Sequence, residues 1–196
     1  MNNIKIWFTS DTHFGQERTL KLSKRDYKTV EEMDEDMIAR WNNKVGKDDI
    51  VFHLGDFGAD YSLVKRLNGK IKLIYGNYEE DYIEKNFNGD KNKFDKYLLD
   101  LGFEEIKGYE GVYYFYETDK YEVFINMHHK PSDAKHNFEK GSRAINLFGH
   151  IHKLQMVKRY GLNVGVDAHN MEPIDLETVL FYDNAIKNHY DNEVFE

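Results

Sequence analysis

A carboxylate and an imidazole lie two positions apart in the sequence, at Asp11 and His13, directly after an apolar run at residues 4–8. The run alternates in the manner of a β-strand, and side chains two apart in a strand point to the same face. We therefore expect both groups to emerge on one side of a sheet. An anionic oxygen and a neutral ring nitrogen together suit divalent first-row cations, so the pair indicates the beginning of a metal site.

Four later runs of strand type also end in groups that bind metals. These are Asp56 after residues 50–55, Asn77 after residues 71–76, His128 or His129 after residues 122–127, and His150 with His152 after residues 144–149. Each of these side chains, taken alone, is as easily a turn residue, a helix cap or an ordinary core or surface histidine. The carboxyl ends of parallel strands meet in one crevice, however, so the ordered set favours a shared ligand site.

The five loops together carry seven ligand-type groups, which are too many for one small cation. Two five- or six-coordinate cations that share one carboxylate would use all seven and leave room for water and a phosphate oxygen. The sequence therefore predicts two divalent cations. Three further polar residues have other interpretations. His53, inside a strand of buried type, is predicted to be a hydrogen-bonded core group, and Asp167 and His169 are predicted to be surface-loop residues at most near the edge of the site.

Composition limits the class of protein. The 196 residues, 40% hydrophobic and 15% aromatic, can close one substantial core, so we expect residues 1–196 to form a single domain. The formal charge of −8 makes long duplex nucleic acid a poor partner. The absence of cysteine excludes disulfides, thiolate zinc sites and a cysteine nucleophile. No signal peptide or membrane-spanning run is recognisable, so a cytoplasmic protein without a membrane partner is expected.

The hydrophobic periodicity predicts an α/β fold. A helix opening at Thr29 and a short helix near residues 63–67 separate three strands, at residues 4–8, 50–54 and 71–75, which is the rhythm of a parallel sheet. Residues 79–101 are predicted to be helical, with a break at residues 88–90 and a stop at Gly102. The second half is predicted to contain a hairpin at residues 112–116 and 121–125 with its turn at residues 117–120, strands at residues 145–148 and 162–166, and a closing helix at residues 175–185 capped by Asp175.

With these motifs in order, the sequence resembles the calcineurin-like metallophosphoesterase superfamily, whose signature runs D-x-H, G-D, G-N-H-D/E, H and G-H-x-H. The matching segments are Asp11-Thr12-His13, Gly55-Asp56, Gly76-Asn77-Tyr78-Glu79, His129 before Lys130-Pro131, and Gly149-His150-Ile151-His152. The resemblance extends from Trp7 to about Pro173 and is strongest to small bacterial and phage members that carry H-F-G after the first motif. The family's H-x-P spacing selects His129 over His128.

The resemblance implies a specific centre and activity. One metal would be bound by Asp11, His13 and His152, the other by Asn77, His129 and His150, and Asp56 would bridge them. Mn²⁺ is the first choice of metal, with Fe, Zn, Ni or Mg as alternatives. The implied fold is a two-sheet mixed β-sandwich flanked by helices, an αββα arrangement. The implied activity is hydrolysis of a phosphomonoester or phosphodiester by metal-activated water, on a phosphorylated small molecule or nucleotide.

The sequence departs from the family at one position that matters for catalysis. Tyr78 stands where the family has a histidine that contacts phosphate and donates a proton, and Gln16 stands where related small members often have histidine. Tyr78 and His128 are the candidate catalytic residues, His128 as a phosphate contact or as a partner of a ligand. Because of Tyr78, an alternative stays open, in which the chain is a catalytically weakened module that binds metal and a phosphorylated ligand.

Overall fold

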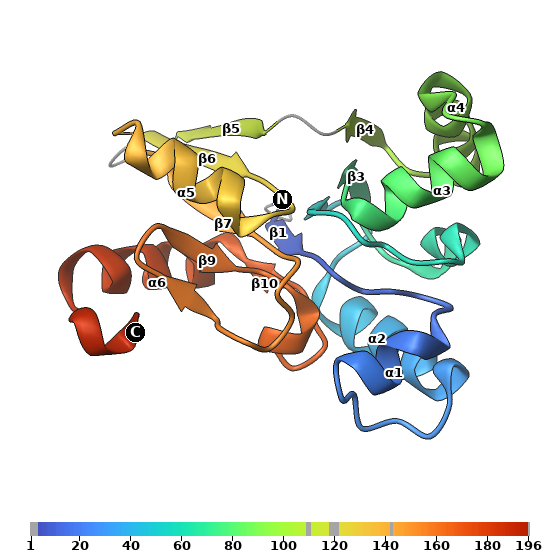
Figure 1. The fold of residues 1–196 in the computed structure, drawn as a ribbon, viewed down its shortest axis with the longest axis horizontal. Helices are drawn as coiled ribbons and strands as arrows, with labels where there is room; N and C mark the ends of the chain where they lie inside the picture. Colours follow the sequence, from blue (N-terminus) through green and yellow to red (C-terminus); the bar gives the residue numbers. More distant parts are fainter. Residues whose placement is uncertain (1–3, 109–110, 118–121, 142, 196) are drawn as a thin grey trace.

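Two five-stranded mixed sheets form the centre of the protein (Figure 1). The computed structural model of the chain describes residues 4–108, 111–117, 122–141 and 143–195. The first sheet contains, in spatial order, β10 (Ile174–Asp175), β1 (Ile6–Thr9), β2 (Ile50–His53), β3 (Lys70–Ile74) and β4 (Glu105–Gly108). The second contains β5 (Val112–Glu117), β6 (Glu122–Met127), β7 (Ile145–Phe148), β9 (Gly161–Asn163) and β8 (Val157–Lys158). Strands β1 to β4 are parallel, as are β6, β7 and β9.

Side chains of the first sheet alternate between two hydrophobic cores. Trp7 and Val51 pack with the helices on one face, whereas Phe8 and Phe52 pack on the other face with residues of the second sheet such as Ile125. Both faces are therefore covered, which is why residues 50–54 are apolar almost without interruption. The predicted fold class, α/β with two mixed sheets flanked by helices, is confirmed.

Helices flank both sheets, with α2 to α4 against the first sheet and α5 against the second, while α6 contacts β8 and β9 of the second sheet and β1 and β10 of the first. The α-helices are α1 (Glu17–Leu22), α2 (Val30–Lys44), α3 (Asn77–Phe87), α4 (Lys91–Leu101), α5 (Pro131–Glu139) and α6 (Leu176–Asn188), and the 3₁₀ turns are η1 (Tyr61–Arg66), η2 (Val166–Ala168) and η3 (Asn192–Val194). Within the described ranges, no helix combines the length and the apolar character needed to cross a bilayer.

Three predicted helix ends are present, each at a residue that stabilises it through a side-chain hydrogen bond or through the conformation of glycine. The Thr29 side chain accepts a hydrogen bond from the Glu32 N–H at the start of α2, at 3.2 Å, and Asp175 does the same for Thr178 of α6, at 2.9 Å. Gly102 ends α4 with φ of 120°, a conformation that few other residues adopt. These ends follow from side-chain hydrogen bonding and from glycine, both of which are visible in the sequence.

Seven elements of the described residues were not predicted, namely α1, β4, α5, β8, β10, η2 and η3. They are short or partly exposed, so they lack a long apolar periodicity. The strand predicted at residues 162–166 is also shorter, because the chain turns into η2 at Val166. The predicted hairpin strands are present as β5 and β6, while residues 118–120 of its predicted turn lie outside the described ranges.

The strand registers bring the carboxyl ends of both sheets to one edge. Thr9 of β1 pairs with His53 of β2, and Phe148 of β7 pairs with Asn163 of β9. An isolated bridge between Ser10 and Gly165 joins the ends of the two sheets. The loops that follow β1, β2, β3, β6 and β7 therefore converge, which is the arrangement that positions a site.

Candidate metal centre

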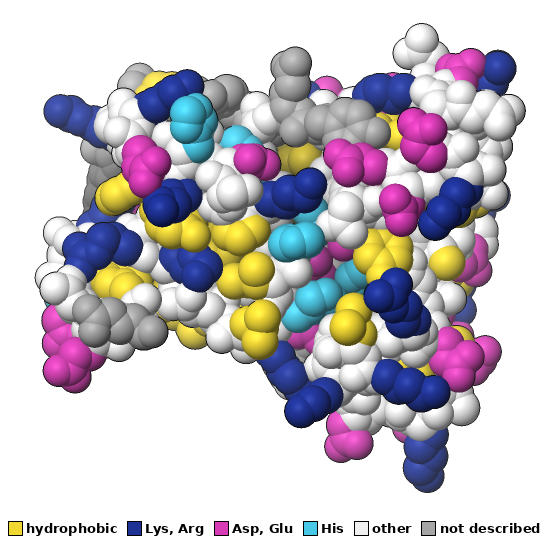
Figure 2. Space-filling view, in the orientation of Figure 1, with side chains coloured by type: hydrophobic (Ala, Val, Ile, Leu, Met, Phe, Trp, Pro, Cys, Tyr) yellow, Lys and Arg dark blue, Asp and Glu magenta, His cyan; other side chains and the backbone are white. Residues whose placement is uncertain are grey.

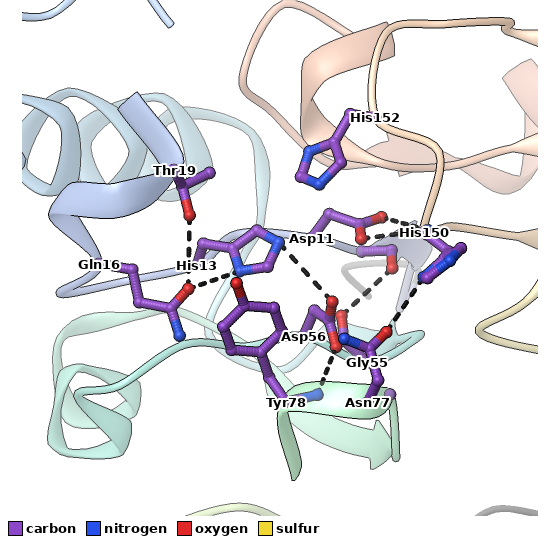
Figure 3. A network of polar contacts seen from close by, with 12 residues as sticks. Asp11, His13, Gln16, Thr19, Gly55, Asp56, Asn77, Tyr78, His150 and His152 are labelled. Carbon is purple, nitrogen blue, oxygen red and sulfur yellow. Dashed lines mark hydrogen bonds and ion pairs between the residues drawn. The ribbon is translucent and has the colours of Figure 1, made fainter. Parts of the chain in front are cut away.

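Two groups of ligand-type side chains lie at this edge, each with its atoms within 4.8 Å of one another (Figure 3). The first cluster is Asp11, His13 and His152, and the second cluster is Asp56, His129 and His150. The seventh predicted ligand, Asn77, joins the second cluster, because its Oδ1 lies 3.1 Å from His129 Nε2 and 3.0 Å from His150 Nδ1. The structure thus brings all seven predicted ligands together.

The backbone at these residues is strained. Five of the seven have left-handed φ values: Asp11 58°, His13 52°, Asp56 57°, His150 71° and His152 51°. Such a conformation costs on the order of 1–3 kcal/mol for a residue other than glycine and persists only where its surroundings enforce it. Backbone hydrogen bonds do so here, for example from Asp11 N–H to Gly55 O at 3.0 Å and from His13 N–H to Asp56 O at 3.1 Å.

The reason predicted from the sequence for the position of Asp11 and His13 is wrong. Asp11 and His13 share a side, but not through strand alternation, since β1 ends at Thr9 and both residues lie in the turn that follows. Glycines make the tight turns possible. A Cβ on Gly149 would lie 2.1 Å from Ser10 Oγ and 2.5 Å from Asp11 Oδ2, so only glycine lets the two loops approach this closely.

The histidines of the first cluster are each held by a partner on the ring nitrogen that faces away from the cluster. His13 Nδ1 lies 2.8 Å from Gln16 Oε1, and its buried Nε2 has no hydrogen-bond partner and faces Asp56 Oδ2 at 3.7 Å. His152 Nδ1 lies 2.7 Å from Asp167 Oδ2 and 3.0 Å from Ser23 Oγ. Since an Nδ1–H donates outward, the Nε2 lone pair remains free to bind a cation.

Asp167 is not a surface-loop residue, contrary to the prediction. Its side chain is 1% exposed and forms a bidentate ion pair with Arg25 at 2.9 and 2.7 Å. Arg25 in turn donates to the carbonyl oxygens of Thr12, at 2.7 Å, and Asp11, at 2.5 Å. Although burial opposes it, the hydrogen bonds from His152 and Arg25 hold the pKa of Asp167 well below its usual range. The pair therefore connects two ligand loops. Asp167 was visible as a polar residue after a strand, but Arg25 follows no motif.

In the second cluster, His129 is held in the same way by the backbone. Its Nδ1 lies 2.8 Å from the carbonyl oxygen of Leu54, which directs Nε2 toward Asp56 Oδ2 at 3.4 Å. Burial lowers the pKa of His129, but the hydrogen bond to Asp56 and the charges of Asp11 and Asp56 outweigh it and raise that pKa to about 9. The surroundings therefore favour positive charge at this position, which a bound cation would also supply.

Glu79 fixes the backbone of the loop that carries Asp56. It is fully buried and accepts hydrogen bonds from the backbone N–H groups of Asp56, Phe57 and Gly76 at 2.8, 2.9 and 2.8 Å. The Tyr78 N–H at the start of α3 donates to Asp56 Oδ1 at 3.0 Å. The Asp56 carboxylate is thereby oriented with Oδ2 between the two clusters.

These observations fit two divalent cations. The donors are carboxylate and amide oxygens and imidazole nitrogens, the set that first-row divalent cations bind. Burial raises the pKa of Asp11 and lowers that of His13 to about 3, so burial disfavours the charged form of both side chains. A bound cation would offset this cost for the Asp11 carboxylate. The orphaned His13 Nε2 and the strained ligand backbone find a common explanation in a cation bound at this point.

Three other residues singled out in the sequence, Tyr78, His128 and His53, belong to neither cluster. Tyr78 is on the first turn of α3, and its ring meets the His13 ring edge-on at 4.6 Å between centroids. His128 is not brought to the clusters, because its Nε2 lies 2.8 Å from Asn137 Nδ2 on α5. The prediction for His53 agrees with the structure, in which its buried Nε2 lies 2.9 Å from Thr12 Oγ1.

A pocket of about 860 Å³ opens over the second cluster and His152. Asp56, Asn77 and His150 lie at its base with Tyr78 beside them. Figure 2 shows the histidines within a hollow of this face, with hydrophobic and basic side chains on both sides of it. A substrate can reach the candidate metal-binding side chains through this hollow.

Comparisons with known proteins identify the family. Residues 4–166 match the Calcineurin-like phosphoesterase superfamily domain, and the chain belongs to this superfamily. An uncharacterised protein of Methanocaldococcus jannaschii is 28% identical over 194 residues, 92% of each chain. The Gene 66 protein of Mycobacterium phage L5 is 36% identical over 81 residues, 37% of this chain and 39% of that protein.

The fold also has a counterpart among solved structures. A protein of unknown function from Aquifex aeolicus aligns with a TM-score of 0.63 at 21% identity, over 92% of this chain and all of that one. This likeness shows the fold alone. The predicted family is confirmed by the match over residues 4–166.

Proposed function

We propose that the protein hydrolyses a phosphomonoester or phosphodiester with the help of two divalent cations, with Mn²⁺ as the first choice. One observation carries the proposal. A single carboxylate oxygen, Asp56 Oδ2, lies 3.7 Å from His13 Nε2 of the first cluster and 3.4 Å from His129 Nε2 of the second. These two distances support Asp56 as the ligand that would bridge the two cations.

The protein's own contribution is to orient the ligands. Bound cations would supply Lewis-acid polarisation of the phosphoryl group and activation of water. Gln16, Asp167 and the Leu54 carbonyl each accept the outward N–H of one histidine, so that His13, His152 and His129 present their lone pairs inward. This order exists before any substrate arrives, which reduces the cost of reorganisation during the reaction.

Tyr78 determines how the leaving group obtains its proton. A histidine titrates near 6.5, whereas burial raises the pKa of Tyr78 above its ordinary value of 10, so its hydroxyl is a weak acid at neutral pH. The proposal therefore includes a preference for aryl esters, whose leaving oxygens need little protonation. Tyr78 also motivates the second candidate, a module that binds metal and a phosphorylated ligand with little turnover.

The first experiment separates these two candidates. Metal-free protein is loaded with Mn²⁺ and assayed with p-nitrophenyl phosphate and bis(p-nitrophenyl) phosphate, next to His152→Ala. We expect hydrolysis of at least one substrate by the native chain, and a loss of activity in the variant. Two bound metals without hydrolysis above the variant would favour the binding module.

The second experiment tests Tyr78 directly. Tyr78→His should raise the rate on alkyl esters by up to roughly a hundredfold and should change the rate on aryl esters less, because general acid catalysis matters most for poor leaving groups. Tyr78→Phe is the matched control, which removes the hydroxyl and keeps the ring. An unchanged alkyl-to-aryl ratio with both metals bound would leave Tyr78 as a residue that only shapes the pocket.

A further inference from the structure

The pocket beside the metal centre is larger than a phosphoryl group requires. Its volume of about 860 Å³ lies at the upper end of pockets that enclose a whole small molecule, roughly 300–1,000 Å³. It extends from the ligand edge to the α1 region and to the loop that follows β7. Most of this space is therefore available to the parts of a substrate that do not react.

The charged residues that line the pocket are mostly basic, although the protein as a whole is acidic. The chain carries a formal charge of −8, yet Arg18, Lys24, Lys85 and Lys153 line the pocket. Among the described residues they face a single carboxylate, Asp81, apart from the candidate ligand Asp56. Asp81 lies 3.5 Å from Lys85, which reduces the charge of that lysine. Lys153 donates to the carbonyl oxygen of Lys24 at 3.1 Å, a contact that leaves both positive charges in place. The wall made by Arg18, Lys24 and Lys153 therefore favours an anion other than the reacting phosphate.

Two large apolar side chains line the same wall without being buried. Leu22, at the end of α1, is 60% exposed, and Leu154, after the ligand loop, is 84% exposed. Tyr78 and Tyr82 of α3 line the same pocket. Single exposed leucines are common on proteins, but two that line one pocket together with aromatic side chains provide an apolar contact surface for a ligand. The His150–His152 loop leads directly to Leu154, so this surface is connected to the ligands.

A ligand that matches this pocket must carry both a second anionic group and an apolar group. Sugar phosphates lack the apolar part, and a simple lipid phosphodiester lacks the second anion. In duplex nucleic acid the bases are stacked and paired, so they cannot reach Leu22 and Leu154. A short single strand offers what the wall can bind, because a second phosphate and an unstacked base flank each reacting phosphodiester.

We propose that Arg18, Lys24 and Lys153, together with Leu22 and Leu154, form a subsite that binds the adjacent phosphate and base of a short single-stranded oligonucleotide. The inference rests on the proposed function, since it assigns the substrate class of the same centre. Arg18 and Lys24 would select the second phosphate, and the two leucines would contact the base.

The test uses the dinucleotide TpT with and without a 5′-phosphate, and Mn²⁺-loaded protein. We expect kcat/KM for the phosphorylated dinucleotide to exceed that for TpT by at least about tenfold, the ratio that one partly desolvated charge contact supplies. The difference should lie mainly in KM. The double variant Arg18→Gln with Lys24→Gln should reduce the ratio to within about threefold. Lys187→Gln, in an ion pair on α6 outside the pocket, is the control and should keep the native ratio.

A second measurement keeps this inference separate from the proposed function. Equilibrium binding of both dinucleotides is measured by calorimetry with the Mn²⁺-loaded protein, and methyl p-nitrophenyl phosphate serves as a small diester that cannot reach the subsite. Hydrolysis of the small diester with equal kcat/KM for the two dinucleotides would overturn the subsite and leave the function intact. Failure to hydrolyse any diester would exclude the phosphodiesterase form of the proposed function, while tighter binding of the phosphorylated dinucleotide, lost in the double variant, would still support the subsite. Equal binding would overturn it in that case.

Discussion

The two clusters contain similar ligands but differ in how firmly the protein holds them. In the first cluster, Asp11 and His13 are buried, and the outward nitrogens of His13 and His152 have partners in Gln16 and Asp167. In the second cluster, by contrast, one ligand is exposed. His150 turns its Nδ1 toward Asn77 and His129, and among the described residues no protein group binds its Nε2.

If each cluster binds a cation, as proposed, this difference predicts that the two cations differ in lability. A ligand whose ring orientation is fixed by a buried partner loses little freedom on binding a metal, whereas an exposed ring must be ordered by the metal itself. The first cluster should therefore bind its cation more tightly and exchange it more slowly. Asp56, which lies between the clusters, would couple the two.

The largest expected effect is that of Asp56→Asn. Replacement of the shared carboxylate with an amide should weaken both sites together and reduce activity by roughly a thousandfold or more, a loss on the scale of several kcal/mol of transition-state stabilisation. His152→Ala, in comparison, should mainly empty the first cluster. Elemental analysis after desalting, with Asp183→Asn as a surface control, measures both effects. Two retained metals in Asp56→Asn would contradict the bridging role.

The next effect in size is that of Asp167→Asn. The variant leaves Arg25 buried without its charged partner, which should destabilise the protein by about 3–5 kcal/mol. It should also lower metal affinity at the first cluster by about 10- to 100-fold, because the orientation of His152 is no longer fixed. Metal titration at a temperature where the variant is folded separates this loss from simple unfolding. Equal weakening of both sites would show that Asp167 acts on the fold as a whole.

The candidate ligands were easier to predict from the sequence than the residues that hold them in position. Asp56, Asn77 and His150 were recognisable because each follows a buried strand, and strand order alone brings their loops together. Arg25 was not, since its role depends on a turn after α1 that has no apolar periodicity and on a partner 142 residues away in the sequence. Contacts of this kind are set by tertiary packing, which local patterns do not contain.

The same limit explains the placement of two histidines. His128 and His129 are adjacent and chemically identical, so only the family spacing distinguished them. The structure shows that His129 faces Asp56, while His128 contacts Asn137 on α5, a helix that was not predicted. The side on which each ring lies follows from the end of β6, whose exact boundary a sequence pattern does not specify.

A smaller effect should appear when a chelator removes the metals. If the second cluster is the more labile, EDTA should release the cations in two phases, and the faster phase should disappear in His150→Ala. We expect the two phases to differ by severalfold to about tenfold in rate, since one exposed ligand accounts for the difference. Stopped-flow detection with a metal-sensitive dye measures the release. A single phase that His150→Ala leaves unchanged would show that the two clusters release their metals alike.

The smallest effect concerns Asp49, a carboxylate that belongs to neither cluster. It shows what such a group does in this fold away from the candidate metal centre. Asp49 lies beside the amino end of β1, opposite to the end where Asp11 lies. It accepts hydrogen bonds from Lys5 N–H, Gly46 N–H and the Trp7 indole at 2.9, 2.8 and 2.9 Å. Burial alone would raise the pKa of Asp49, but these three donors outweigh it and lower the pKa below its ordinary value. For Asp11 the balance is reversed, and burial raises the pKa.

The sign of the pH dependence follows from the lowered pKa of Asp49. A carboxyl whose pKa is lower in the folded than in the unfolded chain stabilises the fold above the unfolded value, near 4, and this contribution is lost as the pH falls through the folded value. Asp49→Asn leaves at least one buried N–H donor without an acceptor and should cost about 1–3 kcal/mol at pH 7. Because protonated Asp49 no longer favours the fold, the difference between native chain and variant should shrink as the pH is lowered from 7 toward 3. Urea unfolding in EDTA at several pH values measures this difference without metal. A difference that is the same at pH 7 and pH 3.5 would mean that Asp49 acts through packing, and that its ionised form has no special role at this end of β1.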